Sequence, residues 1–221
     1  MAKVKANGRS AKAERMTQMG LDSESAITIP GISIKRLSLT IVGDSPLVCH
    51  RWSKKAKQEM LDKQMKKAKQ ARTAKHPWMD YCQSMYWISA MPKEPTQKDI
   101  DAATFGVPAI AFKSAAVDAC SQIDGMKKVF ARGAFHVDGQ IVEIDGKPIM
   151  REDMVRVGMG TADIRHRGEF TEWSCVLTIS YNSNAISAEQ IANLFNVAGF
   201  SIGVGEGRPQ KDRDWGRFHV A

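Results

Sequence analysis

The sequence predicts an α+β fold of the ferredoxin-like (RRM-like) type, with a β-α-β-β-α-β core. Three observations predict it: an alternating apolar segment at the start, two segments with one apolar helical face, and further alternating segments between and after these two. Two helices packed on one face of an antiparallel sheet bury such a pattern. In this prediction the core carries a basic helical insertion at about 50–104 and a hairpin arm.

The first strand is expected at 32–42, ISIKRLSLTIV, where apolar residues alternate and leave one buried face. GDSP then turns the chain, and LVCHRW extends the strand. Ser53 is a good N-cap for a helix through residues 54–75. The apolar residues of that helix form only a thin stripe among lysines, so it can bury little surface and is expected to project.

The second half of the chain supplies the rest of the core. A helix is predicted at about 109–122, after the proline of FGVP. The turn signals VDG and IDG flank the alternating segment QIVEI, which predicts a hairpin arm at 133–150. Residues 166–182 are typical of one long strand with a register shift near Glu172.

The last core helix is expected in SAEQIANLFNVAGF. Ser187 and Gln190 form a capping box at its start, and Gly199 is expected to end it. Its buried face is formed by Ile191, Leu194, Phe195 and Ala198. A glycine-rich loop and a final strand then complete the core.

The basic charge of the chain lies in two segments. The 221 residues carry a net charge of +8. Residues 1–16 hold five basic residues against one acid, and residues 53–75 hold nine against two, so these segments carry +4 and +7 and leave the rest at −3. A basic surface favours a polyanionic partner. We therefore expect a flexible basic arm at 1–28 and a nucleic-acid-binding domain at 29–221.

Several classes are not expected. The four cysteines stand far apart without a C-x-x-C pair, so neither a metal site nor a disulfide framework is predicted. No segment approaches the roughly 18 apolar residues that a membrane span needs, and the basic N-terminus lacks the apolar run of a signal peptide. The sequence predicts a cytoplasmic protein without a cofactor, a metal or a membrane partner.

Two segments resemble the repeat-associated mysterious proteins (RAMPs) of CRISPR systems, a superfamily of RNA-binding ferredoxin-like domains. VPAIAFKSAAVDAC is similar to the entry into that superfamily's first helix, and ANLFNVAGFSIGVGEGRPQKDRDWGRFHV is similar to its second helix, glycine-rich loop and last strand. The likeness covers residues 32–49 and 105–220. The repeating backbone subunit is the nearest type, because it also carries large insertions and a thumb-like hairpin.

The sequence also departs from that pattern. PAIAFK stands where the superfamily more often has Gly or Ser before the Lys, and the chain is short for a backbone subunit. A stand-alone viral relative therefore fits the resemblance as well as a CRISPR component does.

The glycine-rich loop is the first candidate site. Its glycines let backbone N–H groups approach phosphate oxygens without side-chain obstruction, and basic residues surround them. In the alternative interpretation the loop is a mobile connection whose acids, Glu206, Asp212 and Asp214, pair with its arginines. The predicted phosphate-binding residues are Gly203, Gly205, Gly207, Arg208, Lys211, Arg213 and Arg217.

The lysine-rich helix is the second candidate site, with a solvated surface helix as the alternative. Rings beside a basic segment can stack unpaired bases, so Trp52 and Trp78 are candidate stacking residues, with core packing as the alternative. The predicted phosphate-binding residues of this region are Lys54, Lys55, Lys63, Lys66, Lys67, Lys69 and Arg72, and Lys113 of the core helix belongs to the same set.

The favoured function is non-enzymatic binding of single-stranded RNA or DNA, largely independent of sequence. The protein would assemble along its ligand as a homo-oligomer or with other subunits of a ribonucleoprotein complex. One alternative is a metal-independent RAMP-type endoribonuclease with His50 as general base, and with His136, His166 and His219 as secondary candidates. Another is a viral interaction protein that imitates or inhibits a CRISPR effector subunit. The preference for RNA or DNA and the oligomer number stay open.

Overall fold

The structure is a computed structural model of the chain and describes residues 29–67, 74–157 and 160–221. The predicted arm at 1–28 lies outside the described residues. The chain divides into Met1–Ile32 and a compact unit, Ser33–Ala221, that contains every element described below.

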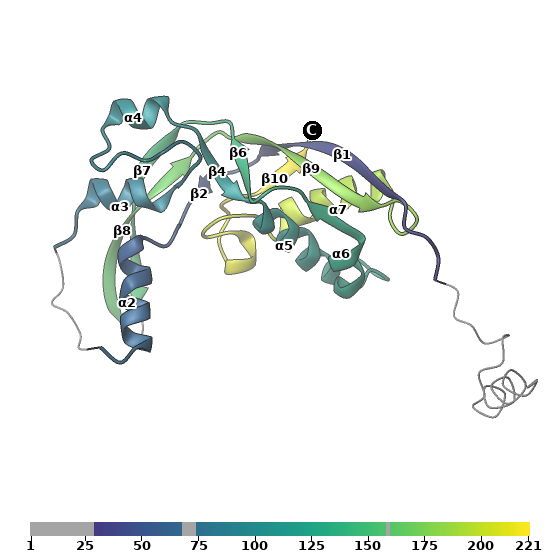
Figure 1. Cartoon of the computed structure of the whole chain (residues 1–221), viewed down its shortest axis with the longest axis horizontal. Helices are drawn as coiled ribbons and strands as arrows, with labels where there is room; N and C mark the ends of the chain where they lie inside the picture. Colours follow the sequence, from purple (N-terminus) through teal and green to yellow (C-terminus); the bar gives the residue numbers. More distant parts are fainter. Residues whose placement is uncertain (1–28, 68–73, 158–159) are drawn as a thin grey trace, which may run out of the picture. The chain divides into compact units, whose positions relative to one another are not determined.

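The main sheet has four antiparallel strands in the order β10-β1-β9-β5 (Figure 1). Its centre is the pairing of β1 (Ile34–Gly43) with β9 (Ser174–Asn182), which runs from Ile34 opposite Asn182 to Val42 opposite Ser174. The edge strands are β10 (Phe218–Val220) and β5 (Phe135–Val137). Leu39 and Ile41 of β1 are buried and the residue between them is exposed, so the expected alternation is confirmed in this half of the strand. Ile32 and Ile34 are exposed, and the strand begins at Ile34 rather than at 32.

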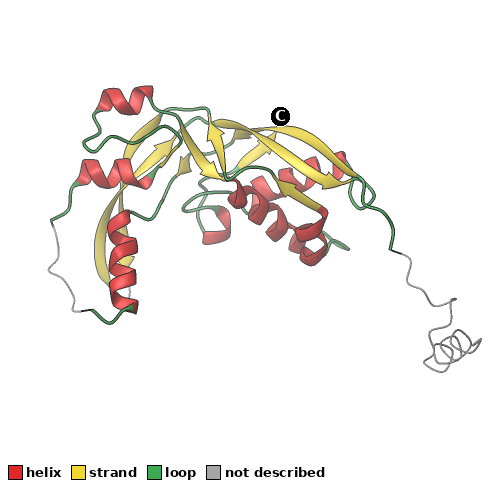
Figure 2. Cartoon of the chain, in the orientation of Figure 1, coloured by secondary structure: helices red, strands yellow, loops and turns green. Residues whose placement is uncertain are grey.

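Three helices, α5 (Ala109–Ala119), α6 (Lys128–Ala134) and α7 (Ala188–Ser201), lie on one side of this sheet (Figure 2). Their aromatic side chains fill the space between the layers: Phe195 of α7 lies 6.0 Å from Phe135 of β5, and Phe112 of α5 lies 5.8 Å from Phe218 of β10. Antiparallel sheets covered by helices confirm the α+β class.

The remaining strands form two smaller sheets. One has the order β3-β4-β6 and the other β2-β8-β7. Within the second sheet, β7 and β8 form a long hairpin that pairs from Pro148 opposite Phe170 to Val157 opposite Thr161. The bounds are β2 (Leu47–Val48), β3 (Tyr86–Trp87), β4 (Phe105–Pro108), β6 (Ile141–Ile144), β7 (Pro148–Val157) and β8 (Thr161–Phe170).

The predicted insertion at about 50–104 contains α2 (Lys54–Gln64), α3 (Pro77–Ser84) and α4 (Gln97–Ala102), together with β3. Ser53 caps α2 as predicted, because its side chain accepts a hydrogen bond from the N–H of Ala56. The helix ends at Gln64 rather than at 75, and Lys66 has a positive φ of 55°. Residues 68–73 lie outside the described residues.

The prediction of a hairpin arm at 133–150 is wrong. β5 pairs with β9 in the main sheet, where Phe135 is buried, whereas β6 pairs with β4 in another sheet, where Val142 and Ile144 are buried. The VDG and IDG turns therefore connect different sheets. The long hairpin is β7–β8, one element further along the chain.

The prediction of one strand at 166–182 is also wrong. The segment contains the end of β8 and all of β9, which belong to different sheets. Trp173, between them, is buried, and its indole N–H donates to the Ser45 carbonyl at 2.9 Å. The register shift near Glu172 in the sequence marks this passage from one sheet to the next.

The last core helix begins as predicted, with reciprocal hydrogen bonds between Ser187 and Gln190. All four residues predicted for its buried face are buried. Gly199 does not end it, since α7 continues to Ser201. This glycine instead allows close packing, because a Cβ there would overlap the Phe218 carbonyl.

Candidate functional site

His50 lies between two hollows of the surface. The loop pocket, of about 250 Å³, is formed by the end of β2, the start of α5 and the glycine-rich loop. The helix pocket, of about 630 Å³, lies between α2, α3 and β8. His50 lines both because its neighbours are fixed: the Cys49 N–H donates to the Gly168 carbonyl and the Arg51 N–H to the Ser84 carbonyl.

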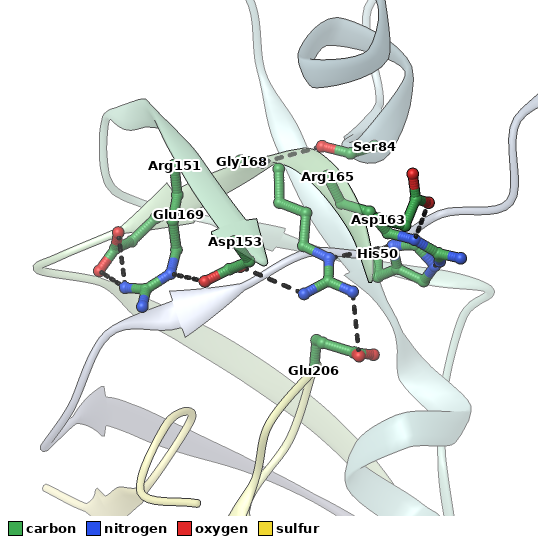
Figure 3. Close-up of polar contacts among 10 residues, drawn as sticks. His50, Ser84, Arg151, Asp153, Asp163, Arg165, Gly168, Glu169 and Glu206 are labelled. Carbon is green, nitrogen blue, oxygen red and sulfur yellow. Dashed lines mark hydrogen bonds and ion pairs between the residues drawn. The ribbon is translucent and has the colours of Figure 1, made fainter. Parts of the chain in front are cut away.

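Two arginines of β8, Arg165 and Arg167, contact His50. Figure 3 shows Arg165 beside His50. Arg165 and Arg167 share one face of the hairpin because they are two residues apart on a strand. The Nε–H of Arg167 donates to Nδ1 of His50 at 3.3 Å, and Nη1 of Arg165 lies 3.2 Å from Nε2. Burial lowers the pKa of His50 below its ordinary value of 6.5, and the positive charge of Arg167 lowers it further. His50 is therefore neutral at pH 7.

The bond to Arg167 also fixes the tautomer of His50. Because Nδ1 accepts, the proton of the neutral ring lies on Nε2. The contact between Nε2–H and the Arg165 guanidinium then joins two donors. An oxyanion placed between them would accept from both groups and would relieve this mismatch.

A network of ion pairs holds the arginines in place. Arg167, 4% exposed, lies 3.2 Å from Asp153 of β7 and 3.2 Å from Glu206 of the glycine-rich loop. Arg151 lies 2.8 Å from Asp153 and 3.2 Å from Glu169. Because the guanidinium of Arg167 contacts the hairpin, His50 and the loop at once, it fixes their relative position.

The glycines of the loop permit close approach of backbone. Gly205 has a φ of 80°, and a Cβ there would lie 2.7 Å from the Val48 carbonyl oxygen; at Gly207, with a φ of 63°, a Cβ would overlap the Trp215 ring. The N–H of Gly203 donates to Ala198, whereas the N–H groups of Gly205, Gly207 and Arg208 have no hydrogen-bond partner among the described residues. Two of the three predicted glycines thus leave a donor available.

The start of α5 lies in the same pocket. Its N-cap is Pro108, which makes no side-chain capping hydrogen bond, and Ile110 and Ala111 of its first turn line the hollow. The first N–H groups of a helix carry a partial positive charge and attract anions. With Arg208 at the rim, the loop pocket is suited to an anionic oxygen cluster such as a phosphate.

The predicted cations of the loop are not paired with acids, although the Arg208 guanidinium donates to the Gln210 side chain at 2.9 and 3.1 Å. Among the described residues, Arg208, Lys211, Arg213 and Arg217 form no ion pair; Glu206 pairs with Arg167 instead, and no pair forms at Asp212 or Asp214. Arg213 lies over the Trp215 ring at 4.8 Å, and Nε of Arg217 is buried without a partner. In the described part of the chain, therefore, Glu206, Asp212 and Asp214 do not neutralise the arginines of the loop, as the alternative interpretation would require.

Among the described side chains, the lysines predicted to bind phosphate in and after α2 do not line the loop pocket. Lys63, Lys66 and Lys67 are exposed, and Lys67 lies 3.1 Å from Asp62. Lys54 and Lys55 begin α2, but the positions of their side chains are not described, and Lys69 and Arg72 lie outside the described residues. No described side chain of α2 is buried, and only Asp62 among them is half-buried, so the helix packs little of its surface against the rest of the fold.

Lys113 serves the fold. Its ammonium donates to the carbonyls of Arg132 at 2.8 Å and Phe135 at 2.6 Å, and it lies 2.9 Å from Nδ1 of His136. Burial lowers its pKa. Because an ammonium has three donors, these contacts leave none for a phosphate.

The two predicted stacking residues, Trp52 and Trp78, differ in how far they are exposed to solvent. Trp78 is half-buried, donates to the Pro95 carbonyl at 2.6 Å and lies 5.4 Å from the Tyr81 ring, so it packs within the fold. Trp52 is 50% exposed and lines the helix pocket.

The charged face of the β7–β8 hairpin was not predicted from the sequence. Its signal was present as a period of two, since Arg151 and Asp153 alternate on one strand and Arg165, Arg167 and Glu169 on the other. The wrong hairpin assignment hid it.

The described residues contain no disulfide, no metal-binding group and no helix suited to a membrane. The four cysteines are free and buried, and burial raises the pKa of Cys49 and of Cys175 to about 12. In residues 29–67, 74–157 and 160–221, no group of three or more His, Cys, Asp or Glu side chains is placed to hold a metal ion. None of the helices described there has both the length and the apolar character needed to cross a membrane.

Comparison with known proteins gives a distant structural similarity. No family model matches the sequence, and no curated protein matches it. The chain is similar to the crystal structure of Cmr6 from Pyrococcus furiosus, at 10% sequence identity and a TM-score of 0.41, over 86% of this chain and 100% of that one. A similarity at this level identifies neither a family nor a function.

Proposed function

We propose that the protein binds single-stranded nucleic acid, RNA or DNA, mainly through the phosphates and largely without sequence preference. The observation that carries the proposal is the loop pocket, where Gly205 and Arg208, whose N–H groups have no hydrogen-bond partner among the described residues, lie beside Ile110 and Ala111 of the first turn of α5. Backbone donors of this kind bind phosphate oxygens without reading a base.

The charge distribution supports a polymer rather than a small phosphate compound. Exposed lysines continue the positive surface beyond the pockets, with Lys63 and Lys66 at the end of α2 and Lys211 on the loop. The net charge of the whole chain is +8. Charge spread over several elements gives a long polyanion more contacts than a compact ligand could make.

The topology supports a finer assignment within this proposal. The order β10-β1-β9-β5, with α5 and α7 on one face, is consistent with the proposal of a ferredoxin-like core. Together with the motifs at 107–120 and 192–220, it favours a RAMP-like backbone subunit. On this proposal the protein assembles along its ligand with copies of itself or with other subunits of a ribonucleoprotein complex.

The geometry does not favour the ribonuclease alternative. A general base needs a lone pair that can take the 2′-OH proton. In His50 the Nδ1 lone pair accepts from Arg167 and Nε2 carries the proton, so neither nitrogen can act as a base in this arrangement. The same ring is well suited to donate to a phosphate.

The test is a salt titration of binding to labelled oligo(U) and oligo(dT) between about 50 and 200 mM salt. Replacing Lys63, Lys66 and Lys67 by Gln removes three exposed cations in the last turn of α2 and directly after it. We expect the log–log salt slope to fall by about 0.7 for each phosphate that the variant no longer neutralises.

The control variant removes the same charge elsewhere, by replacing the exposed residues Lys35, Lys93 and Lys98 with Gln. We expect it to retain the wild-type slope. Equal slopes in the two variants would show that binding responds to net charge alone and would refute the proposed surface. Recovery of foreign protein subunits without nucleic acid after purification at low salt would favour the interaction-protein alternative.

A further inference from the structure

We infer that the helix pocket binds an unstacked nucleobase, with Trp52 as the aromatic platform. The inference rests on the proposed function and adds a base-binding subsite to a surface that otherwise recognises phosphates. It follows from the exposure of Trp52, from the groups that line the pocket and from the position of the pocket beside His50, Arg165 and Arg167, which we call the phosphate-binding cluster.

Trp52 differs from the other four tryptophans of the chain. The indole N–H groups of Trp78, Trp87 and Trp173 donate to backbone carbonyls. The guanidinium groups of Arg151 and Arg213 lie over the Trp215 ring, at 4.1 and 4.8 Å from its centroid. Trp52 is 50% exposed and has no hydrogen bond or ring contact among the described residues. A large ring that the fold does not use is available for stacking.

The walls of the pocket are suited to a flat, partly polar group. Met60 of α2 and Met79 of α3 supply apolar surface. Gln83 supplies a carboxamide that has no hydrogen-bond partner among the described residues, and an amide of this kind can donate to and accept from the edge of a base. The volume of about 630 Å³ lies within the roughly 300–1,000 Å³ of small-molecule sites.

A buried polar group in the same wall lacks a partner. His166 lines the pocket with a side chain that is 9% exposed, and its Nε2 lies 3.0 Å from Glu152. Its Nδ1 is buried and has no hydrogen-bond partner among the described residues.

The pocket is continuous with the phosphate-binding cluster. His50 lines both hollows, and Arg165, whose guanidinium faces His50, lines the helix pocket. A phosphate between these two donors would therefore place the attached nucleoside beside the helix pocket. This arrangement gives stacking without selection among the four bases, since every base has a π-face.

The test compares two strands of about 12 nucleotides, oligo(dT) and an abasic strand of the same length and charge. Fluorescence anisotropy at one salt concentration gives both dissociation constants. We expect the wild type to bind the base-bearing strand roughly 5- to 100-fold more tightly. Trp52→Ala should bring the two constants together while leaving the affinity for the abasic strand unchanged, and Trp52→Tyr should restore most of the difference.

Phe200→Ala is the matched control, because Phe200 is 74% exposed on α7 and lines neither pocket. It should retain the wild-type ratio. If Trp52→Ala also retains that ratio, or if the wild type binds both strands equally, the base-binding subsite is refuted while phosphate binding stands. If the wild type binds neither strand, the proposed function fails, and the subsite fails with it.

Discussion

Arg167 connects three segments that are far apart in the sequence. Its guanidinium contacts His50 after β2, Asp153 on β7 and Glu206 in the glycine-rich loop. Desolvation offsets much of the attraction in a buried ion pair, so the pairs formed by Arg167 contribute more to position than to net stability. The cluster is therefore pre-organised for a ligand before the ligand binds.

The lowered pKa of His50 makes stability depend on pH. In the unfolded chain this histidine takes up a proton near its ordinary pKa of 6.5, whereas burial and Arg167 keep it neutral to a lower pH in the folded chain. The free energy of unfolding should therefore be highest above pH 6.5 and should decrease as the pH falls from 6.5 to the folded-state pKa. Urea denaturation at a series of pH values from about 7.5 to 5 measures this.

His50→Gln provides the comparison for this measurement. The amide oxygen can still accept from Arg167, but the side chain no longer titrates. The decrease in stability over this pH range should be smaller in the variant than in the wild type. Identical pH profiles would show that His50 has the same pKa in the folded and unfolded chains.

Part of the candidate site could be predicted from the sequence. Local patterns predict Gly205, Gly207 and Arg208 as phosphate-binding residues and His50 only as the general base of the ribonuclease alternative, and the structure places all four at the loop pocket or beside it. The sequence does not show that Lys113 is a structural lysine rather than a phosphate-binding one, because the carbonyls that its ammonium contacts lie about 20 residues further along the chain. The partners of the arginines on β8 depend on which strands form the hairpin, and composition does not determine that.

At the level of elements, two helical glycines have opposite surroundings. A Cβ on Gly199 of α7 would overlap the Phe218 carbonyl, whereas a Cβ on Gly133 of α6 would meet nothing within 4 Å. We expect Gly199→Ala to destabilise the protein by about 1–3 kcal/mol through overpacking. Gly133→Ala should stabilise it by about 0.5–1 kcal/mol, because alanine is the better helix former.

Urea midpoints of the two variants test this pair directly. The opposite signs form the prediction, since helix propensity alone would stabilise both proteins. Stabilisation by Gly199→Ala would mean that α7 and β10 can separate without any cost in packing.

Local sequence signals predicted where helices and strands begin, but they did not predict which strands pair with one another. The caps at Ser53 and Ser187 were predicted correctly because a cap depends on residues within one helical turn. The prediction of a hairpin arm at 133–150 was wrong because the two strands of this segment belong to different sheets. Phe135 of β5 is buried beside β9, which comes later in the chain, and Ile144 of β6 is buried beside β4, which comes earlier. A turn signal shows where a chain turns, and the burial of the flanking strands decides what they pair with.

At the level of the molecule, the buried apolar residues of the described chain lie between Leu39 and Phe218. Deleting residues 1–28 should therefore leave the thermal unfolding transition unchanged. It also removes the five basic residues of 1–16, so affinity for single strands should decrease. The salt slope should fall by about 0.7 for each phosphate that those residues neutralise in the full chain.

Calorimetry and the same salt titration measure the two effects on one preparation. A large decrease in melting temperature would place part of the folding energy in residues 1–28. An unchanged salt slope would remove that segment from the binding surface.

The pairing of β1 with β9 has a consequence for synthesis of the protein. The paired residues are about 130–150 positions apart, so at roughly 5–20 residues per second a ribosome adds β9 about 7–30 s after β1. During that interval Leu39 and Ile41 lie on a nascent strand whose central partner does not yet exist. The main sheet therefore assembles late in translation, and the exposed strand is a site for chaperone binding or for aggregation until β9 is made.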